Sequence, residues 1–346
     1  MDIQKAIAKL VSGQHLGAAE MEAVMTTIMQ GEAQEAQIGG LLVALRMLGE
    51  NADEIAGAAA VMRRLATPIH INLENTVDIV GTGGDGANLF NVSTASSFVI
   101  AAAGGRVAKH GNRSVSSSSG AADVLEAAGV NLSLDSEQVA RCVDELGVGF
   151  IFAPAYHSAM RHAIGPRKAL GMRTIFNLLG PLTNPAGVRR QVIGVYDKAY
   201  CRLLAEVLQR FGSEHAMVVH SEDGLDEISL AAPTHVVELK DGALNEYTIT
   251  PETLGIESAA LAGLEVDTAE ESLALIQDAL GKQRGPNASR AADMIALNAG
   301  AAIYVCGIAD SLQQGVVMAQ DAIASGLGGE KIRELAAFTE CFSVCE

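Results

Sequence analysis

A glycine-rich loop between a short strand and a helix constrains the fold of this chain more than any other segment. A β-branched run at 77–80 leads into four glycines within six positions, and Asn91, Ser93 and Thr94 then open an Ala-rich segment with helical character. The four glycines are Gly81, Gly83, Gly84 and Gly86. Glycines let the backbone approach a ligand closely, and the start of a helix adds free N–H groups and a positive dipole end. The segment therefore predicts a binding site for phosphate or pyrophosphate.

Asp85 inside this loop is unusual for a site that binds only an anion. A carboxylate is expected there if the anion arrives with a metal ion or a polyhydroxylated sugar. The loop has Gly-x-Gly-x-x-Gly spacing without the usual form of a dinucleotide-binding loop, and no Gly-Lys-Ser/Thr of a Walker loop follows. Glycine-rich turns after strands are also common as purely structural features, so the interpretation depends on the segments downstream.

Short apolar segments alternate with Ala-rich helical patterns from residue 77 onward. Strands are expected at 77–80, 106–109, 149–152, 192–195 and 216–220, and helices at 93–103, 121–128, 136–146 and 200–210. This alternation predicts a largely parallel sheet with helices on both faces. A Lys-Asp-Gly turn between 234–239 and 245–249 predicts an antiparallel hairpin, and helices return from about residue 272.

Residues 1–70 have a different character, with apolar residues at helical spacing and no strand pattern. The predicted fold is therefore α/β: a small all-helical domain at 1–70, joined in space by about 160–185, and a large α/β domain at 75–346. The large domain is expected to hold a mostly parallel central sheet and the antiparallel hairpin.

Charge and cysteine usage exclude several classes of protein. The 346 residues include 41 acidic and 24 basic side chains, for a net charge of -17, which disfavours nucleic-acid and membrane-surface binding. Five scattered cysteines without a Cys-x-x-Cys pair fit a reducing cytoplasm. No signal-peptide pattern or membrane-spanning apolar run is present, so we expect a cytoplasmic location.

A second polar loop, at 107–120, follows another expected strand. It reads Lys109-His110-Gly111-Asn112-Arg113 and continues into a serine-rich stretch. Open α/β sheets bind ligands at the carboxyl ends of their strands, so the two loops are expected to face one crevice. Lys109 and Arg113 supply charge, while serines and backbone N–H groups supply directional donors. A serine-rich stretch alone is often a flexible linker, but its position here favours a ligand-binding loop.

Adjacent acids at Asp226 and Glu227 follow the expected strand at 216–220. Carboxylates at such a strand end suit Mg²⁺, which prefers oxygen ligands and often bridges to substrate phosphates. The alternative is a solvated acidic turn, and the metal interpretation depends on the phosphate partner that the other two loops imply.

Positive residues gather in the Gly/Pro-interrupted helical segment at 155–185. They are Arg161, Arg167, Lys168 and Arg173. The alternative is a solvated cationic helix face. No Ser–His–Asp or Cys–His order stands out among the histidines, so nucleophilic catalysis is disfavoured.

Four motifs in this order resemble the anthranilate phosphoribosyltransferase family of tryptophan biosynthesis over nearly the whole chain. They are Gly81-Thr82-Gly83-Gly84-Asp85 with Asn91-Val92-Ser93-Thr94; Lys109-His110-Gly111-Asn112-Arg113; Arg173-Thr174-Ile175-Phe176-Asn177 through Gly180-Pro181-Leu182-Thr183-Asn184-Pro185; and Gly224-Leu225-Asp226-Glu227. The resemblance implies a nucleoside-phosphorylase-like fold and a homodimer. It implies transfer of the 5-phosphoribosyl group of phosphoribosyl pyrophosphate (PRPP) to the amine of anthranilate, releasing pyrophosphate.

The resemblance also implies roles for residues at matching positions. PRPP would be held by Gly81, Gly84, Asp85, Asn91, Val92, Ser93, Thr94, Lys109, His110, Gly111, Asn112, Arg113, Ser114, Val115, Ser116 and Ser117. Anthranilate would contact Gly81, Asn112 and Arg167, with His110, His157 and Pro181 along its access path. One Mg²⁺ would bind Ser93 and Glu227, and a second would bind Asp226 and Glu227. Lys109 and metal-bound Glu227 would stabilise charge electrostatically, without a side-chain nucleophile.

Two positions depart from the family pattern. Leu89 and Ala121 stand where many members carry hydroxyl side chains that contact PRPP, so weaker PRPP binding is the most that we expect. Two alternatives remain. A pyrimidine-nucleoside phosphorylase of the same fold is expected to carry Lys-His-Ser-Thr-Gly-Gly, and a nucleic-acid-binding paralogue is expected to carry an excess of basic residues.

Overall fold

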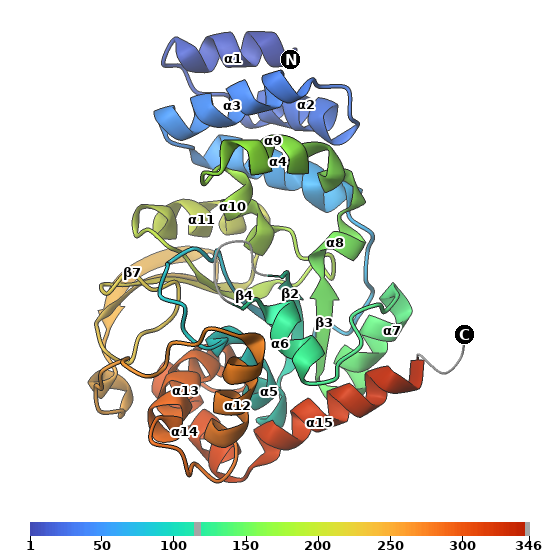
Figure 1. Cartoon of the computed structure of the whole chain (residues 1–346). Coiled ribbons are helices and arrows are strands. Elements are labelled where there is room, and N and C mark those ends of the chain that lie inside the picture. Colours follow the sequence, from blue (N-terminus) through green and yellow to red (C-terminus); the bar gives the residue numbers. More distant parts are fainter. Residues whose placement is uncertain (114–118, 343–346) are drawn as a thin grey trace.

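The computed structural model describes residues 1–113 and 119–342. Its N-terminal part is a bundle of four helices, drawn in blue at the top of Figure 1. They are α1 (Ile3–Val11), α2 (Ala18–Met29), α3 (Glu35–Leu48) and α4 (Ala52–Leu65). We call these four helices the helical bundle. No helix in the described parts of the chain is both long and apolar enough to cross a membrane.

Capping side chains set where the bundle helices begin. Asp2 accepts a hydrogen bond from the Gln4 amide at 3.0 Å, before the first turn of α1. Asn51 and Glu54 form a reciprocal capping box at the start of α4, with both bonds at 2.9 Å. Glu54 also accepts from the amide of Leu16 at 2.9 Å, which ties the α1–α2 connection to α4. The caps therefore stabilise the bundle together with its apolar core.

The rest of the chain surrounds a seven-stranded sheet of order β3-β2-β1-β4-β5-β6-β7. The strands are β1 (Thr76–Gly81), β2 (Arg106–Gly111), β3 (Val148–Phe152), β4 (Arg190–Gly194), β5 (His215–Ser221), β6 (Thr234–Lys240) and β7 (Ala243–Ile249). The first five are parallel, and β6 and β7 pair antiparallel at one edge. The structure thus confirms the expected mixed sheet and its hairpin.

Helices connect and cover these strands. They are α5 (Val92–Ala102), α6 (Ala121–Ala127), α7 (Ser136–Arg141), α8 (Ala153–Tyr156), α9 (Arg161–Leu170), α10 (Phe176–Leu179), α11 (Ala199–Arg210), α12 (Ala269–Ala279), α13 (Ala288–Val305), α14 (Leu312–Ala324) and α15 (Leu327–Glu340). Where one helix was expected at 136–146, α7 ends at Arg141 and a π-helical turn continues over Cys142–Leu146. Asp135 is the N-cap of α7 and accepts from the Gln138 amide at 2.8 Å.

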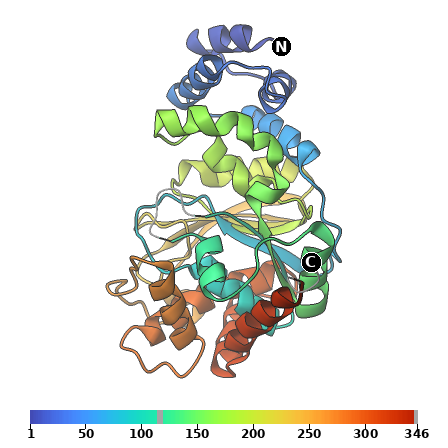
Figure 2. The ribbon, with the colours of Figure 1, turned by 45° about the vertical axis from the view of Figure 1, so that its right-hand side comes forward.

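Alternation along the strands divides the apolar residues between two cores. Val192 and Met217 belong to a core with α5 and α13 on one face of the sheet, whereas their neighbours Ile193 and Val218 face α11 and the bundle. Figures 1 and 2 show α11 between the sheet and the helical bundle. The bundle therefore packs onto the rest of the molecule through a continuous apolar core.

The carboxyl ends of the parallel strands point toward the helical bundle. The arrowhead of β3 shows this direction in Figure 1, and its parallel neighbours share it. Helix α9 packs against α2 and α3, so the segment after β3 returns to the bundle. The loops that carry the expected site residues consequently lie at the edge of the sheet nearest the bundle.

Candidate active site at the carboxyl edge of the sheet

The glycine loop after β1 and the acidic turn after β5 are in direct contact. The amide of Gly83 donates a 2.6 Å hydrogen bond to Oδ2 of Asp226. A methyl group on Gly81 would overlap the Asp226 carboxylate, so this approach requires glycine at that position. The amide of Ser93, in the first turn of α5, donates to Oε1 of Glu227 at 3.2 Å. One acid therefore binds the glycine loop and the other binds a helix N-terminus.

Lys109, on β2, reaches the same point. Its ammonium donates to the hydroxyl of Ser93 at 3.1 Å and to the carbonyl of Ile79 at 2.6 Å. Only 3% of the residue is exposed. An ammonium has three N–H donors, and the described residues supply acceptors for two of them. Lys109 therefore retains one donor for a ligand.

Negative charge exceeds positive charge at this point. Burial, reinforced by Asp85, raises the pKa of Asp226, and burial, reinforced by Asp226, raises the pKa of Glu227. Lys109 opposes the rise at Glu227, and burial lowers the pKa of Lys109 itself. Three carboxyl groups with one ammonium need a further cation to stay ionised together.

The donor set fits a hard divalent ion. Asp226, Glu227 and the Ser93 hydroxyl offer only oxygen atoms, which Mg²⁺ prefers. Across residues 1–113 and 119–342, no three His, Cys, Asp or Glu side chains are grouped closely enough to hold a metal ion by themselves. An ion here would need further oxygen ligands, which Mg²⁺ commonly takes from water and substrate phosphates.

The glycine loop exposes consecutive amide donors. The N–H groups of Gly84, Asp85 and Gly86 have no acceptor among the described residues. The Asp85 carboxylate accepts from the amide of Ala87 at 3.1 Å, which closes the turn locally. Free amides in a tight turn beside a helix N-terminus form a concave donor surface for an anion.

Asn91, Val92 and Thr94 play parts that the sequence pattern did not reveal. The Asn91 side chain does not cap α5 but accepts from the hydroxyls of Ser119 and Ser272, at 3.1 and 2.8 Å. Val92 and Thr94 are both buried. The Val92 amide donates to the carbonyl of Phe90 at 2.7 Å, and the buried Thr94 hydroxyl has no hydrogen-bond partner among the described residues.

The structure describes the second loop as far as Arg113 and again from Ser119. Arg113 donates to Asp123 at 3.1 Å and also to Glu126, so its guanidinium is paired in this structure. Asn112 accepts from the Arg113 amide at 2.7 Å and is exposed. A Cβ on Gly111 would clash with Phe150, which places the backbone against β3. Four predicted PRPP contacts, Ser114, Val115, Ser116 and Ser117, lie outside the described residues.

Two buried histidines lie side by side near the carbonyl of Gly180. The ring centroids of His110 and His157 are 5.1 Å apart, and His110 Nδ1 lies 3.2 Å from the Gly180 oxygen. Burial lowers the pKa of His110 to about 3 and that of His157 to about 4. Both imidazoles are therefore neutral at physiological pH. Pro181 follows directly, and its carbonyl accepts from Gln191 at 2.8 Å.

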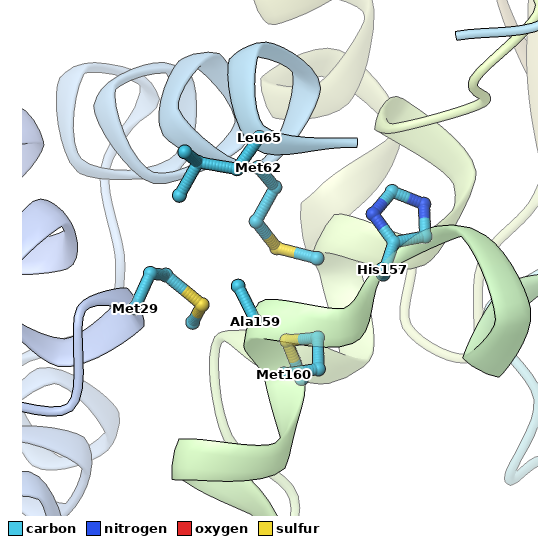
Figure 3. A pocket seen from close by; sticks show the side chains of 6 residues that line it. All are labelled: Met29, Met62, Leu65, His157, Ala159 and Met160. Atoms are coloured by element: carbon cyan, nitrogen blue, oxygen red, sulfur yellow. The ribbon is translucent and has the colours of Figure 1, made fainter. Parts of the chain in front are cut away.

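His157 also lines an apolar pocket beneath the helical bundle. Figure 3 shows its ring beside the side chains of Met29, Met62, Leu65, Ala159 and Met160, which come from α2, α4 and the turn before α9. Arg167, on α9, stacks on the Phe176 ring at 5.1 Å, and no described carboxylate pairs with it. The segment from His157 to α9 therefore supplies part of the apolar lining and also carries an unpaired guanidinium.

Sequence reasoning missed Asp78 and the partner that holds it. Asp78 is fully buried in β1, and it accepts from the Asn184 amide group at 2.8 Å and from the His110 amide at 3.2 Å. Burial raises the pKa of Asp78 to about 6, while Lys109 lowers it. The available signal was a charged residue within an otherwise apolar strand, which requires buried partners.

Comparisons with known proteins agree with this architecture. A family model described as "Glycosyl transferase family, a/b domain" matches residues 73–328, and one described as "Glycosyl transferase family, helical bundle domain" matches residues 4–66. The chain is 67% identical over 340 residues to the anthranilate phosphoribosyltransferase of Cellvibrio japonicus, covering 98% of this chain and 99% of that protein.

Two solved structures share the fold over almost their whole length. The Thermus thermophilus anthranilate phosphoribosyltransferase has a TM-score of 0.90 at 43% identity, covering 97% of this chain and 99% of that chain. The Saccharomyces cerevisiae enzyme, solved in complex with PRPP and Mg, has a TM-score of 0.88 at 26% identity, covering 98% of each chain. The chain therefore belongs to the anthranilate phosphoribosyltransferase family.

Proposed function

We propose that this site transfers the 5-phosphoribosyl group of PRPP to the amine of anthranilate, giving N-(5-phosphoribosyl)anthranilate and pyrophosphate. One observation carries the proposal: the glycine loop, the start of α5 and the acidic turn meet through Gly83–Asp226 and Ser93–Glu227. Such a meeting of amide donors, carboxylates and a buried ammonium suits a metal-bound diphosphate better than any neutral ligand. Neither a nucleoside phosphorylase nor a nucleic-acid-binding paralogue gains support from the comparisons.

PRPP would lie along the glycine loop and the N-terminus of α5. The free amides from Gly84 to Gly86 and the third donor of Lys109 supply hydrogen bonds to phosphate oxygens. The remaining predicted contacts, Asn91 through Thr94 and Lys109 through Ser117, flank these groups in sequence. Leu89 and Ala121 contribute no side-chain hydrogen bond, so backbone donors would take their place.

Mg²⁺ would be held by Ser93, Asp226 and Glu227, with two ions sharing Glu227. The raised pKa values of Asp226 and Glu227 support this assignment, because burial and then repulsion from neighbouring carboxylates raise them and a bound divalent cation favours both carboxylates in their ionised form. When bound, Mg²⁺ neutralises charge that develops on the departing pyrophosphate.

The reaction breaks the bond between ribose C1 and the pyrophosphate oxygen and forms a bond between C1 and the anthranilate nitrogen. Positive charge builds on the ribose ring and negative charge on the leaving group, and the nitrogen loses one proton. Lys109 is buried and held by hydrogen bonds, so its ammonium can stabilise the leaving group without rearrangement of the side chain or of solvent. The amine is neutral and already nucleophilic, so orientation supplies much of the remaining acceleration.

Anthranilate would approach from the side of Arg167 and the two neutral histidines. The planar guanidinium of Arg167 suits a carboxylate, and its position over Phe176 leaves its edge available. Asn112, Gly81 and Pro181 complete the expected contacts. The low pKa values of His110 and His157 support a role in shaping the path, because neutral rings do not retain an anionic substrate.

We also infer that the protein is a homodimer formed through the helical bundle. Most of the exposed large apolar side chains of the described residues lie in the bundle or on the segment that packs against it: Met1, Val11, Met47, Leu65, Ile164 and Met172. Exposed apolar side chains gathered on one part of a molecule are typical of a protein interface. The mass in solution at micromolar concentration, measured by light scattering, tests this inference, and a monomeric mass contradicts it.

The activity is tested by following anthranilate fluorescence. We expect a loss of fluorescence with purified protein, PRPP and Mg²⁺ together, and none when any one of the three is omitted. Mass spectrometry of the product identifies the phosphoribosyl adduct. Retained fluorescence with all components present, at millimolar PRPP and Mg²⁺, would contradict the proposed function.

A further inference from the structure

The guanidinium of Arg173 lies against the glycine loop. Arg173 is in the segment between α9 and α10, and a methyl group placed on Gly84 would lie 3.1 Å from its Nη2 and 3.2 Å from its Nε. The edge that carries these two donors therefore lies beside Gly84, on the side from which a side chain would project. Tyr196 constrains the face of the guanidinium: the central carbon of Arg173 lies 4.0 Å from the centroid of the Tyr196 ring.

Tyr196 is itself fixed at both ends. Its amide donates to the hydroxyl of Thr82, at the start of the glycine loop, at 3.1 Å. Its ring contacts Tyr200 at 5.4 Å between centroids, and the Tyr200 hydroxyl accepts from Arg46 at 2.8 Å and lies 3.2 Å from Glu50. The aromatic platform under Arg173 is thus tied to the loop on one side and to the helical bundle on the other.

The Arg173 side chain has no acceptor among the described residues. No ion pair or side-chain hydrogen bond within residues 1–113 and 119–342 involves it, although the chain carries 41 acidic residues. A stacked guanidinium keeps its in-plane donors available, and those donors here adjoin the free amides of Gly84 to Gly86. A cation and amides that converge without acceptors form a site for an anion with several oxygens.

We propose that Arg173 binds a phosphate group of PRPP on the glycine loop and that Tyr196 is the positioning residue that holds its guanidinium in plane. The inference rests on the proposed function, because it takes the phosphate to be part of PRPP. It adds a side-chain cation to the free backbone donors of the glycine loop. It also assigns Arg173 and Arg167 to different substrates, although only six positions separate them in the basic segment.

Binding of Mg²⁺–PRPP without anthranilate, measured by calorimetry, tests the proposal. Arg173→Met removes the charge and keeps an unbranched side chain, so we expect the Kd for PRPP to rise about 10- to 100-fold. Arg173→Lys keeps the charge without the planar fork and is expected to recover only part of the loss. Arg161→Met, an exposed arginine of the same basic segment, is the matched control and should leave the Kd unchanged.

Two simpler ligands identify which phosphate is bound. Weaker binding of pyrophosphate with Mg²⁺ to Arg173→Met assigns the contact to the leaving group, whereas weaker binding of ribose 5-phosphate assigns it to the other end. Either outcome supports the proposal.

Tyr196 variants distinguish a positioning role from a purely structural one. Tyr196→Phe keeps the ring and is expected to bind PRPP within about threefold of the parent, whereas Tyr196→Leu removes the stack and should resemble Arg173→Met in PRPP affinity. A structural role alone would lower the melting temperature of Tyr196→Leu without changing the Kd for PRPP.

Two outcomes would overturn the proposal. One is an unchanged Kd for PRPP in folded Arg173→Met, and the other is a change confined to the KM for anthranilate. Failure of the proposed function is a separate result, because it would appear as the parent protein forming no phosphoribosyl product.

Discussion

Lys109 and Glu227 are joined through a single residue, Ser93. The Lys109 ammonium donates to the Ser93 hydroxyl at 3.1 Å, and the Ser93 amide donates to the Glu227 carboxylate at 3.2 Å. The cation on β2 and the acid of the turn after β5 are therefore bridged by one residue at the N-terminus of α5. Removing the charge of Lys109 or of Glu227 therefore changes the electrostatic environment of the other.

Glu227→Gln is expected to lower kcat by about 10²- to 10³-fold and to weaken its dependence on Mg²⁺, because the amide keeps the shape but not the charge. Activity measured across a Mg²⁺ titration checks this. Glu222→Gln, an exposed acid of the same turn, is the control and should keep both properties. Unchanged kinetics in Glu227→Gln would remove the metal assignment.

Gly81→Ala is expected to lower stability by about 1–3 kcal/mol and to abolish most PRPP binding, since the new methyl group overlaps Asp226. Thermal unfolding and PRPP calorimetry measure the two effects. Gly39→Ala is the matched control, because an added Cβ on this helical glycine meets no atom within 4 Å. That variant should be unchanged or more stable by up to about 1 kcal/mol. Equal behaviour of the two variants would contradict the close contact.

Arg167→Ala is expected to raise the KM for anthranilate about 10- to 100-fold and to leave the KM for PRPP nearly unchanged, because its guanidinium, stacked on Phe176 without a carboxylate partner, is proposed to bind the anthranilate carboxylate. Steady-state kinetics with each substrate varied in turn measures this. Lys168→Ala, the neighbouring position, is the control. A rise confined to the KM for PRPP would mean that the two substrate pockets are interchanged.

His157 is expected to make the folded state less stable in mild acid. Burial lowers its pKa to about 4, whereas an unfolded histidine titrates near 6.5. The unfolded chain therefore takes up a proton first, and stability falls as the pH drops from about 6.5 toward 4. The loss that His157 causes between pH 7 and pH 5 is about 2 kcal/mol.

His157→Gln should remove this contribution. Denaturant midpoints at pH 7 and pH 5 provide the comparison, with His70→Gln as a control at an exposed position. If His157→Gln and the parent lose equal stability between the two pH values, the assignment of a buried, neutral imidazole to His157 is wrong.

Local patterns predicted the secondary structure closely. Strand β6 and the helix α11 begin within one residue of their expected positions, because alternation and helical spacing are properties of neighbouring residues. The cap at Asp135 is local in the same sense, since donor and acceptor lie three positions apart. The π-helical turn after Arg141 was not predicted, because a segment of 5 residues is too short to show a periodicity of its own.

The residue types of the site were also predictable from the chain, but their contacts were not. Glycines after β1 and acids after β5 indicated a phosphate and a cation through residue type and position alone. The hydrogen bond between Gly83 and Asp226 spans 143 positions and exists because β4 alone separates β1 from β5 in the sheet. The order of the strands in the sheet cannot be inferred from the residue type at Gly83 or at Asp226.

Neighbouring residues were thus sufficient to assign strands and helices, to place glycine and charge along the chain, and to indicate the family, since each depends on local pattern. Packing alone established that Arg173 lies on the glycine loop, that Arg113 pairs with acids, and that His110 and His157 are buried together. Those properties depend on which surfaces meet when the sheet and bundle pack, because burial and proximity arise from distant parts of the chain.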